Sequence, residues 1–361
     1  MIEHAYAVIL AGGKGERFWP MSTARQPKQL LSLVGERSLL AQAVERLEGL
    51  VPPERVLVIT SADLVAATRE SVPEVPPEQI IGEPVGRDTA PAVALAAALV
   101  KQRDPEGVFC ILTADHVMGD LEVFRDTLRD AMDLAFREDV LITIGIRPTE
   151  PSTGYGYIEA PEVFSRVNES TFRRARRFVE KPDGDTARKY LAEGNFYWNS
   201  GMFIWSVAAL EKAFRAHCPA LADMMDSLGP HVGKQSFEEQ FKTTYETVTR
   251  ISIDYALMEH AENIVMAEGV FAWDDVGSWT ALSNHFPADE GGNVVVGAGE
   301  LLGAEGNIVV SRDHLTAVVG VSDLVVVQAP GVTLVCPKDR VQDVKKMVQQ
   351  LREAGTYDEV L

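Results

Sequence analysis

A glycine-rich loop carrying basic side chains follows an apolar run near the N-terminus. The segment reads LAGGKGERFWP over residues 10–20, and Lys28 follows it in QPKQ. Glycines let backbone N–H groups approach phosphate oxygens closely, and Arg17 and Lys28 can neutralise charge that develops during phosphoryl or nucleotidyl transfer. The loop lacks the G-x-x-x-x-G-K-[ST] pattern, and Phe18 stands where G-x-G-x-x-G needs its third glycine. It therefore predicts either a tight turn or a phosphate-binding loop of another kind.

Two aspartates in distant segments are candidates for a metal site. Asp115 follows the apolar run GVFCILTA, and Asp275 lies in WDDVG. For either aspartate alone, a helix cap or a solvated carboxylate is the simpler explanation. If the two meet at one edge of a sheet, they could hold Mg²⁺, which commonly takes one or two carboxylates together with substrate phosphates.

The elements that must position these residues alternate between strands and helices. Apolar runs and helical periodicity predict strands at 6–11, 55–60, 107–115 and 140–146, and helices at 38–50, 89–102 and 123–138. This alternation predicts an α/β fold with a doubly wound, mostly parallel sheet. Ligands of such sheets bind at the carboxyl ends of the strands, which here points to the loops after Leu10 and Leu112.

The C-terminal part of the chain has a different pattern. The middle of the chain is mixed and includes a predicted helix at 252–262, capped by Ser252. Beyond it, short β-branched runs separated by glycines precede a predicted helix at 341–355. We therefore expect two domains, a Rossmann-like domain over 1–285 and a small β-rich domain over 286–361.

Composition and charge exclude several classes of protein. A net charge of −19 argues against a surface for nucleic acid or anionic membrane, but it permits a small phosphorylated ligand held by a few basic residues. The longest apolar run, 90–100, is too short to span a bilayer, and the N-terminus does not resemble a signal peptide. Three scattered cysteines form no metal-binding pair. We expect a cytoplasmic protein without nucleic-acid or membrane partners.

The glycine-rich loop and seven later segments also carry a resemblance to a known family. LAGGKGERFWPMSTARQPKQ resembles the signature loop of the sugar-nucleotide pyrophosphorylases, and its Phe-Trp-Pro and Pro-Lys-Gln variants resemble the mannose-1-phosphate guanylyltransferases in particular. The resemblance covers about residues 1–285 and continues in order through GEPVGRDTAPAVALAA, TADH, TGYGYIE, FVEKPD, WNSGMF, SIDYALMEH and WDDVGSW.

The resemblance implies a GT-A-like nucleotidyltransferase domain and a C-terminal domain like a left-handed β-helix, through which a homodimer would form. It also implies a reaction, in which α-D-mannose 1-phosphate attacks the α-phosphorus of GTP, giving GDP-mannose and pyrophosphate. Arg17 and Lys28 would be catalytic, and Asp115 and Asp275 would bind Mg²⁺. The implied nucleotide-binding residues are Leu10, Ala11, Gly12, Gly13, Gly15, Arg17, Arg87, Asp88 and Thr89. The implied sugar-phosphate-binding residues are Gly154, Tyr155, Gly156, Glu180, Lys181 and Asn199.

Some alternatives stay open at this level. Asp88 stands where the family often has asparagine, and it either caps the following helix, which we favour, or accepts hydrogen bonds from guanine. Glu180 and Lys181 form either a surface ion pair or part of the sugar site. The function could instead be a pyrophosphorylase for another nucleotide and sugar pair, or a sugar-nucleotide-binding paralogue without turnover.

Overall fold

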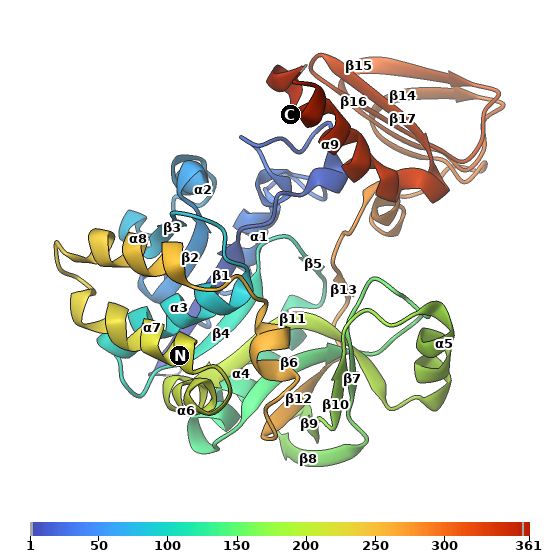
Figure 1. The fold of residues 1–361 in the computed structure, drawn as a ribbon. Helices are drawn as coiled ribbons and strands as arrows, with labels where there is room; N and C mark the ends of the chain where they lie inside the picture. Colours follow the sequence, from blue (N-terminus) through green and yellow to red (C-terminus); the bar gives the residue numbers. More distant parts are fainter. Residues whose placement is uncertain (1–2, 356) are drawn as a thin grey trace. The chain divides into compact units, whose positions relative to one another are not determined.

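The computed structural model describes residues 3–355 and 357–361 (Figure 1). The chain forms two compact units. Among the described residues, the first contains 3–12, 43–113 and 118–273, and the second contains 13–42, 114–117, 274–355 and 357–361. Neither unit is continuous along the chain, because the segment after the first strand belongs with the C-terminal residues. The expected domain boundary near 285 stays a prediction.

The first unit is built on a mixed sheet in the order β3-β2-β1-β4-β11-β6-β12-β9-β8. Its N-terminal half is parallel: β1 pairs with β2 and β4, and β2 pairs with β3. These strands are almost entirely buried, which explains their nearly continuous apolar sequence. Their bounds are β1 Ala5–Ala11, β2 Val56–Ser61, β3 Ile80–Glu83 and β4 Val108–Thr113.

The other half of this sheet is largely antiparallel. Strand β11 runs antiparallel to β4 and β6, while β12 is parallel to β6. The register of β11 shifts between Asn199 and Phe203, so the strand carries a bulge there. The predicted α/β fold is confirmed, and its sheet contains both parallel and antiparallel pairs. The bounds are β6 Leu141–Ile146, β7 Tyr157–Glu159, β8 Glu162–Val167, β9 Ser170–Arg174, β10 Arg177–Val179, β11 Phe196–Ser206 and β12 Ile264–Gly269. Two short strands, β5 Val117–Met118 and β13 Trp273–Asp274, complete the set.

Helices cover the sheet and fill the main core. Helix α3 is apolar on nearly every side and is buried against the sheet and α7, which suits its alanine-rich sequence. The helix bounds are α1 Leu39–Glu45, α2 Val65–Ser71, α3 Thr89–Arg103, α4 Leu121–Arg137, α5 Gly184–Glu193, α6 Val207–His217, α7 Pro219–Leu228 and α8 Phe237–Thr247. Among the described residues, none of the helices is long and apolar enough to cross a membrane.

The predicted helix at 252–262 is wrong in its extent. The structure has a single π-helical turn, Asp254–Met258, although Ser252 Oγ does accept a bond from Tyr255 N at 3.4 Å. The start of α3 holds the residues before this turn: Ala90 N donates to Ile251 O (3.1 Å) and Ile253 N donates to Thr89 Oγ1 (2.9 Å). These non-local bonds fix the residues that precede the turn, and the first of them satisfies the carbonyl of Ile251.

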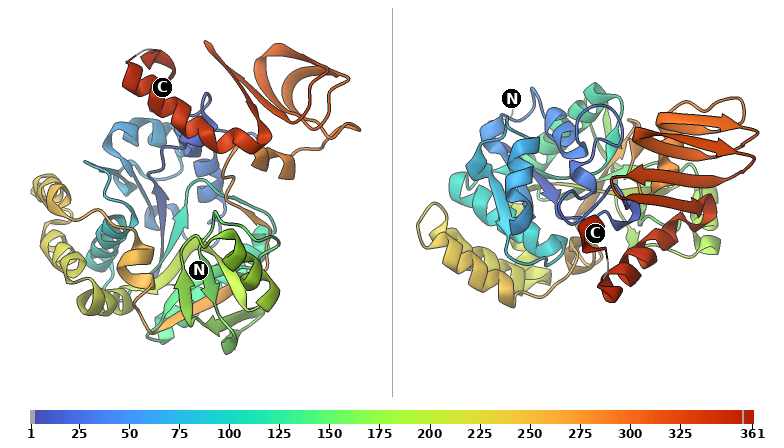
Figure 2. Two further views of the ribbon diagram at one scale, coloured as in Figure 1. Left: turned by 45° about the vertical axis from the view of Figure 1, so that its right-hand side comes forward. Right: turned by 90° about the horizontal axis from the view of Figure 1, so that it is seen from above.

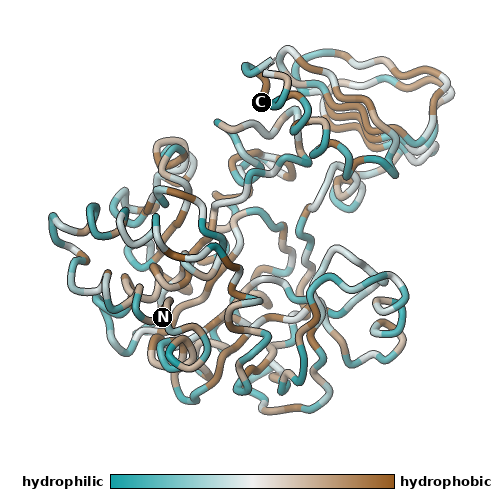
Figure 3. The backbone as a smooth tube through the Cα atoms, in the orientation of Figure 1, coloured by the Kyte–Doolittle hydropathy of each residue, from teal (hydrophilic) through white to brown (hydrophobic). Residues whose placement is uncertain are grey.

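The second unit contains the predicted β-rich domain. Strands β14 Val294–Leu302, β15 Ile308–Val319 and β16 Leu324–Ala329 stack in parallel, and β17 Val332–Pro337 returns antiparallel to β16. Figure 3 shows this sheet as one of the most apolar parts of the chain. Asparagines link successive turns: Asn293 Oδ1 accepts from Asn307 N, and Asn307 Oδ1 accepts from Leu324 N, both at 2.9 Å.

Helix α9 Val344–Ala354 runs beside this sheet (Figure 2). Val344 and Val348 on α9 share a core with the inner valines of β14–β16. Phe18 and Trp19, from the segment after β1, are buried in the same core, and this packing is why residues 13–42 belong to the second unit.

Candidate active site

The glycine-rich loop is shaped by one glycine and anchored by two aromatic residues. Gly15 has a φ of 61°, and a Cβ there would lie 2.8 Å from Lys28 N and 3.0 Å from Ser22 Oγ, so only glycine fits. A 3₁₀ turn, Glu16–Phe18, follows. The Phe18 ring packs edge-on against Trp279 with 4.9 Å between centroids, and Trp279 Nε1 donates to Trp19 O at 3.1 Å. The FWP variant in the sequence is therefore the anchor of the loop.

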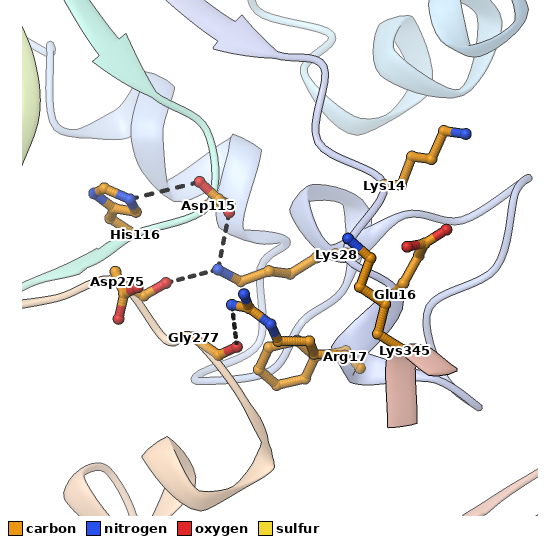
Figure 4. A pocket seen from close by; sticks show the side chains of 11 residues that line it. Lys14, Glu16, Arg17, Lys28, Asp115, His116, Asp275, Gly277 and Lys345 are labelled. Atoms are coloured by element: carbon orange, nitrogen blue, oxygen red, sulfur yellow. Dashed lines mark hydrogen bonds and ion pairs between the residues drawn. The ribbon is translucent and has the colours of Figure 1, made fainter. Parts of the chain in front are cut away.

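This loop borders a cavity of about 370 Å³ within the second unit (Figure 4). Its lining combines four cationic side chains with three carboxylates. The lining residues are Lys14, Gly15, Glu16, Arg17, Phe18, Lys28, Asp115, His116, Asp275, Gly277 and Lys345. The structure thus brings together Arg17, Lys28, Asp115 and Asp275, which come from three distant segments.

Lys28 is at the centre of this cavity. It is only 6% exposed, and its Nζ donates to Asp115 Oδ2 at 2.9 Å and to the backbone oxygen of Asp275 at 2.6 Å. Burial alone would raise the pKa of Asp115, but the Lys28 ammonium and His116 lower that pKa below its usual range. Asp115 therefore stays ionised beside the lysine. Arg17 makes one long bond, from Nη1 to Gly277 O at 3.4 Å.

The two adjacent aspartates of WDDVG have different environments. Asp274 accepts bonds from Val276 N at 2.7 Å and Asn284 Nδ2 at 2.9 Å, and His285 Nε2 lies 3.0 Å from it. Despite burial, these contacts lower the pKa of Asp274. Asp275 is the aspartate that lines the cavity. The contacts of Asp274 hold the turn, including Val276 at a φ of 46°, which is unusual for a β-branched residue.

The other predicted nucleotide-binding residues lie in the first unit or at its boundary. Leu10 and Ala11 end β1, and Gly12 and Gly13 follow. Asp88 has a φ of 70°, and its Oδ1 accepts from Thr89 N at 2.9 Å, so it caps α3, the alternative that we favoured. Arg87 Nε donates to Tyr245 O at 2.9 Å. A role of these residues in binding a base stays a prediction.

Glu83, at the end of β3, is a buried carboxyl that sequence reasoning missed. Tyr245 Oη donates to Glu83 Oε1 at 2.7 Å, and a Cβ placed on Gly12 would lie 3.7 Å from Glu83 Oε2. Burial raises the pKa of Glu83 to about 7, against the opposing effect of the Tyr245 hydrogen bond. The sequence signal is a glutamate inside GEPVGRDTAPA, a segment whose predicted site residues are only Arg87, Asp88 and Thr89.

A second, smaller pocket in the first unit gathers predicted sugar-site residues. It is lined by Gly156, Phe178, Val179, Glu180, Asn199, Asp254 and Glu259. A Cβ on Gly156 would lie 2.6 Å from Glu180 Oε2, so glycine is needed for this close approach. Lys181 has a φ of 44°, and its Nζ pairs with Glu180 Oε1 at 2.5 Å. Glu180 and Lys181 therefore form an ion pair, and Glu180 also lines the pocket.

Two other predicted sugar-site residues are close in sequence to Gly156 but do not line this pocket. Gly154 N donates to Ser152 Oγ at 3.2 Å. The ring of Tyr155 packs against Trp198 and Trp273, with centroids 4.8 Å and 5.3 Å away. Neither Gly154 nor Tyr155 belongs to the lining set, and their roles stay predictions.

Asp254, in the π-helical turn, is a further residue that sequence reasoning missed. Its Oδ1 accepts from Asn199 Nδ2 at 2.8 Å, while Asn199 Oδ1 accepts from Gly201 N at 3.2 Å. These bonds fix the orientation of the Asn199 amide. Burial and the nearby Glu180 carboxylate raise the pKa of Asp254 to about 6. Asp254 occurs in the SIDYALMEH motif, but nothing in the sequence indicated that it meets Asn199.

Comparisons with known proteins agree with this geometry. Residues 6–291 match the model of the nucleotidyl transferase family, and 300–351 match that of the mannoseP isomerase/GMP-like beta-helix domain. The predicted β-helix-like character of the C-terminal domain is thereby confirmed. The handedness of that domain stays a prediction.

Individual relatives match nearly the whole chain. The chain is 36% identical to a mannose-1-phosphate guanylyltransferase of Escherichia coli, in a match covering 98% of this chain and 74% of the relative. It is 38% identical to the mannose-1-phosphate guanylyltransferase ManC of Salmonella typhimurium, with the same coverage of both chains. A crystal structure from Thermus thermophilus, described as a mannose-1-phosphate geranyltransferase, matches with a TM-score of 0.86 and 36% identity, covering 97% of this chain and 99% of that one. The chain therefore belongs to the mannose-1-phosphate guanylyltransferase family of nucleotidyl transferases.

Proposed function

We propose that this protein transfers GMP from GTP to α-D-mannose 1-phosphate and releases pyrophosphate. The observation that carries the proposal is the buried Lys28, held by Asp115 inside a cavity that Arg17 and the glycine-rich loop also line. The relatives named above support the choice of guanine nucleotide and mannose.

The proposed reaction needs charge compensation more than proton transfer. A phosphate oxygen of the sugar phosphate forms a bond to the α-phosphorus of GTP, and the bond from that phosphorus to the β-phosphate oxygen breaks. The attacking oxygen is already anionic, so no strong general base is required. Preorganised cations can reduce repulsion between the anions, and pockets can align the reacting atoms. Lys28 uses two of its three donors on protein atoms, which leaves one for a phosphate oxygen.

We also propose that the cavity takes Mg²⁺ together with the nucleotide. Asp115 and Asp275 line the same cavity and offer the oxygen ligands that this ion prefers. No group of three or more metal-ligating side chains occurs among the described residues, which suits an ion completed by phosphates and water. When bound, the ion would supply positive charge to the phosphates.

A panel of nucleotides and sugar 1-phosphates, scored for pyrophosphate release, tests the proposed function. We expect GTP with mannose 1-phosphate to be the best pair. A clear preference for UTP or dTTP would contradict the choice of substrates and favour another pyrophosphorylase. Binding without pyrophosphate release for any pair would favour the paralogue without turnover.

We further propose a homodimer formed through the C-terminal domain. Large apolar side chains are exposed on its strands, among them Leu302, Leu315, Val319 and Val335. Exposed apolar groups of this kind often mark protein interfaces. Sedimentation equilibrium of the whole chain would test it, and a monomer at micromolar concentration would contradict it.

A further inference from the structure

Helix α9 is fixed against the glycine-rich loop. Arg352 on α9 forms an ion pair with the Glu16 carboxylate in the loop. On the adjoining positions of the same helix face, Val344 and Val348 are buried in the core that also contains Phe18. The position of α9 relative to the loop is therefore set by apolar packing and by charge.

This packing brings a lysine of the C-terminal helix to the cavity. Lys345 is one of its lining residues, and Figure 4 shows its side chain extending from α9 toward the loop. The side chain is exposed. Its neighbour Lys346 does not line the cavity, and its Nζ donates to Asp343 Oδ1 at 2.7 Å.

The charges around the cavity leave Lys345 available to a ligand. Lys28 is engaged by Asp115 and by a backbone oxygen, and the carboxylate of Glu16 is engaged by Arg352. Lys345, by contrast, makes no hydrogen bond or ion pair to any residue within 3–355 or 357–361. An exposed ammonium beside this cavity of about 370 Å³ is suited to contact a phosphate with several negative charges.

We propose that Lys345 binds the terminal phosphates of the nucleotide, the part that leaves as pyrophosphate. The C-terminal domain then supplies part of the nucleotide site in addition to any role in assembly. The proposal rests on the proposed function insofar as the cavity takes a nucleoside triphosphate. It concerns the phosphates only and is independent of which base and sugar are used.

Steady-state kinetics with three variants of the full chain test the proposal. Lys345→Gln should raise KM for GTP about tenfold and leave KM for mannose 1-phosphate within about twofold, because one charge-assisted contact to phosphate is lost. Lys345→Arg should retain most of the wild-type affinity. Lys346→Gln is the matched control, since it removes the adjacent lysine of the same helix, and it should behave as wild type. Equal KM values for GTP in Lys345→Gln and Lys346→Gln would overturn the proposal.

Calorimetric binding of inorganic pyrophosphate separates this inference from the proposed function. Lys345→Gln should weaken pyrophosphate binding about tenfold relative to Lys346→Gln, and more strongly at low salt than at high salt. If the wild type binds pyrophosphate through Lys345 but does not use GTP with mannose 1-phosphate, the proposed function fails and this inference holds. If both variants bind pyrophosphate as the wild type does, the inference fails whatever the substrates are.

Discussion

Replacing Lys28 by glutamine separates its catalytic role from its structural one. The variant removes an ammonium that lies 2.9 Å from Asp115 Oδ2 and leaves that carboxylate without its cation. If Lys28 stabilises charge in the transition state, kcat should fall about 10²–10³-fold, which corresponds to about 2.7–4 kcal/mol. KM for both substrates should change less than kcat.

The same substitution should destabilise the fold only modestly. Breaking a fully buried ion pair costs about 3–5 kcal/mol, but the Asp115 side chain is 35% exposed, so solvent screening reduces the expected loss to about 1–2 kcal/mol. Because the pKa of Asp115 is lowered in the folded protein, this stabilisation is present above its unfolded pKa and is lost as the pH falls through the folded value. The difference in unfolding free energy between wild type and variant should therefore shrink below about pH 4.

Pyrophosphate release and urea unfolding measure the two effects in the same preparations. Lys101→Gln is a suitable control, because Lys101 also pairs with a carboxylate, Glu211, at 2.6 Å but lies outside both pockets that contain predicted site residues. We expect it to leave kcat unchanged. If Lys28→Gln loses stability but keeps kcat within tenfold of wild type, Lys28 is only a structural partner of Asp115, and the assignment of a catalytic cation is refuted.

Four further substitutions test other residues of the candidate site and its surroundings. Asp275→Asn should abolish Mg²⁺-dependent turnover with little change in Tm, and wild-type rates for this variant would remove Asp275 from the site. Asp274→Asn weakens contacts that hold the turn and should lower the free energy of unfolding by about 1–3 kcal/mol. Because the pKa of Asp254 is raised to about 6 in the folded protein, ionisation of this carboxyl destabilises the fold as the pH rises from 3.8 through about 6. Asp254→Asn should therefore be more stable than wild type by about 1–2 kcal/mol at pH 8 and equal to it below about pH 4, as measured by urea unfolding. No gain at pH 8 would show that burial of this carboxyl is not costly. Gly156→Ala places a methyl group 2.6 Å from Glu180 Oε2 and should raise KM for mannose 1-phosphate several-fold, about fivefold or more, with KM for GTP unchanged; an equal rise in both KM values would argue against a sugar-specific pocket.

Local sequence patterns were sufficient for the elements that form the centre of the sheet. The predicted strands at 6–11, 55–60 and 140–146 each match an observed strand to within one residue at either end. Each is a short, largely apolar run rich in β-branched residues or bounded by glycine, a pattern typical of a buried strand. The predicted helix at 89–102 matches α3, because a capping aspartate and a proline in the first turn mark its start.

Elements that depend on partners elsewhere in the chain were predicted less well. Strands β8 and β9 form a hairpin at the edge of the sheet, with few fully buried residues, and their sequences lack a clear apolar run. The segment after Ser252 has a helical pattern, but only one π-helical turn forms there, and bonds with the start of α3 fix its first residues. For β8 and β9, pairing with neighbouring strands decides what the local sequence leaves open.

The sequence by itself determined which residues could bind phosphate and in what order the motifs occur. Gly15, Arg17 and Lys28 could be recognised because the reason for each residue type is local: a close backbone approach or a cationic side chain in or near a glycine-rich loop. The alternative that Asp88 caps α3 could be weighed in the same way, since a cap depends only on the residues beside it.

Only the tertiary structure decided which distant side chains meet. Lys345 lies more than 300 residues after the glycine-rich loop and reaches its cavity because α9 packs on that loop. Asp254 reaches Asn199 through the π-helical turn, and Glu83 meets Tyr245 across 162 residues. The physical reason is the same in each case. Burial in a shared core and long-range hydrogen bonds place these groups. Apolar periodicity indicates which face of an element is buried, but not which distant segment covers it.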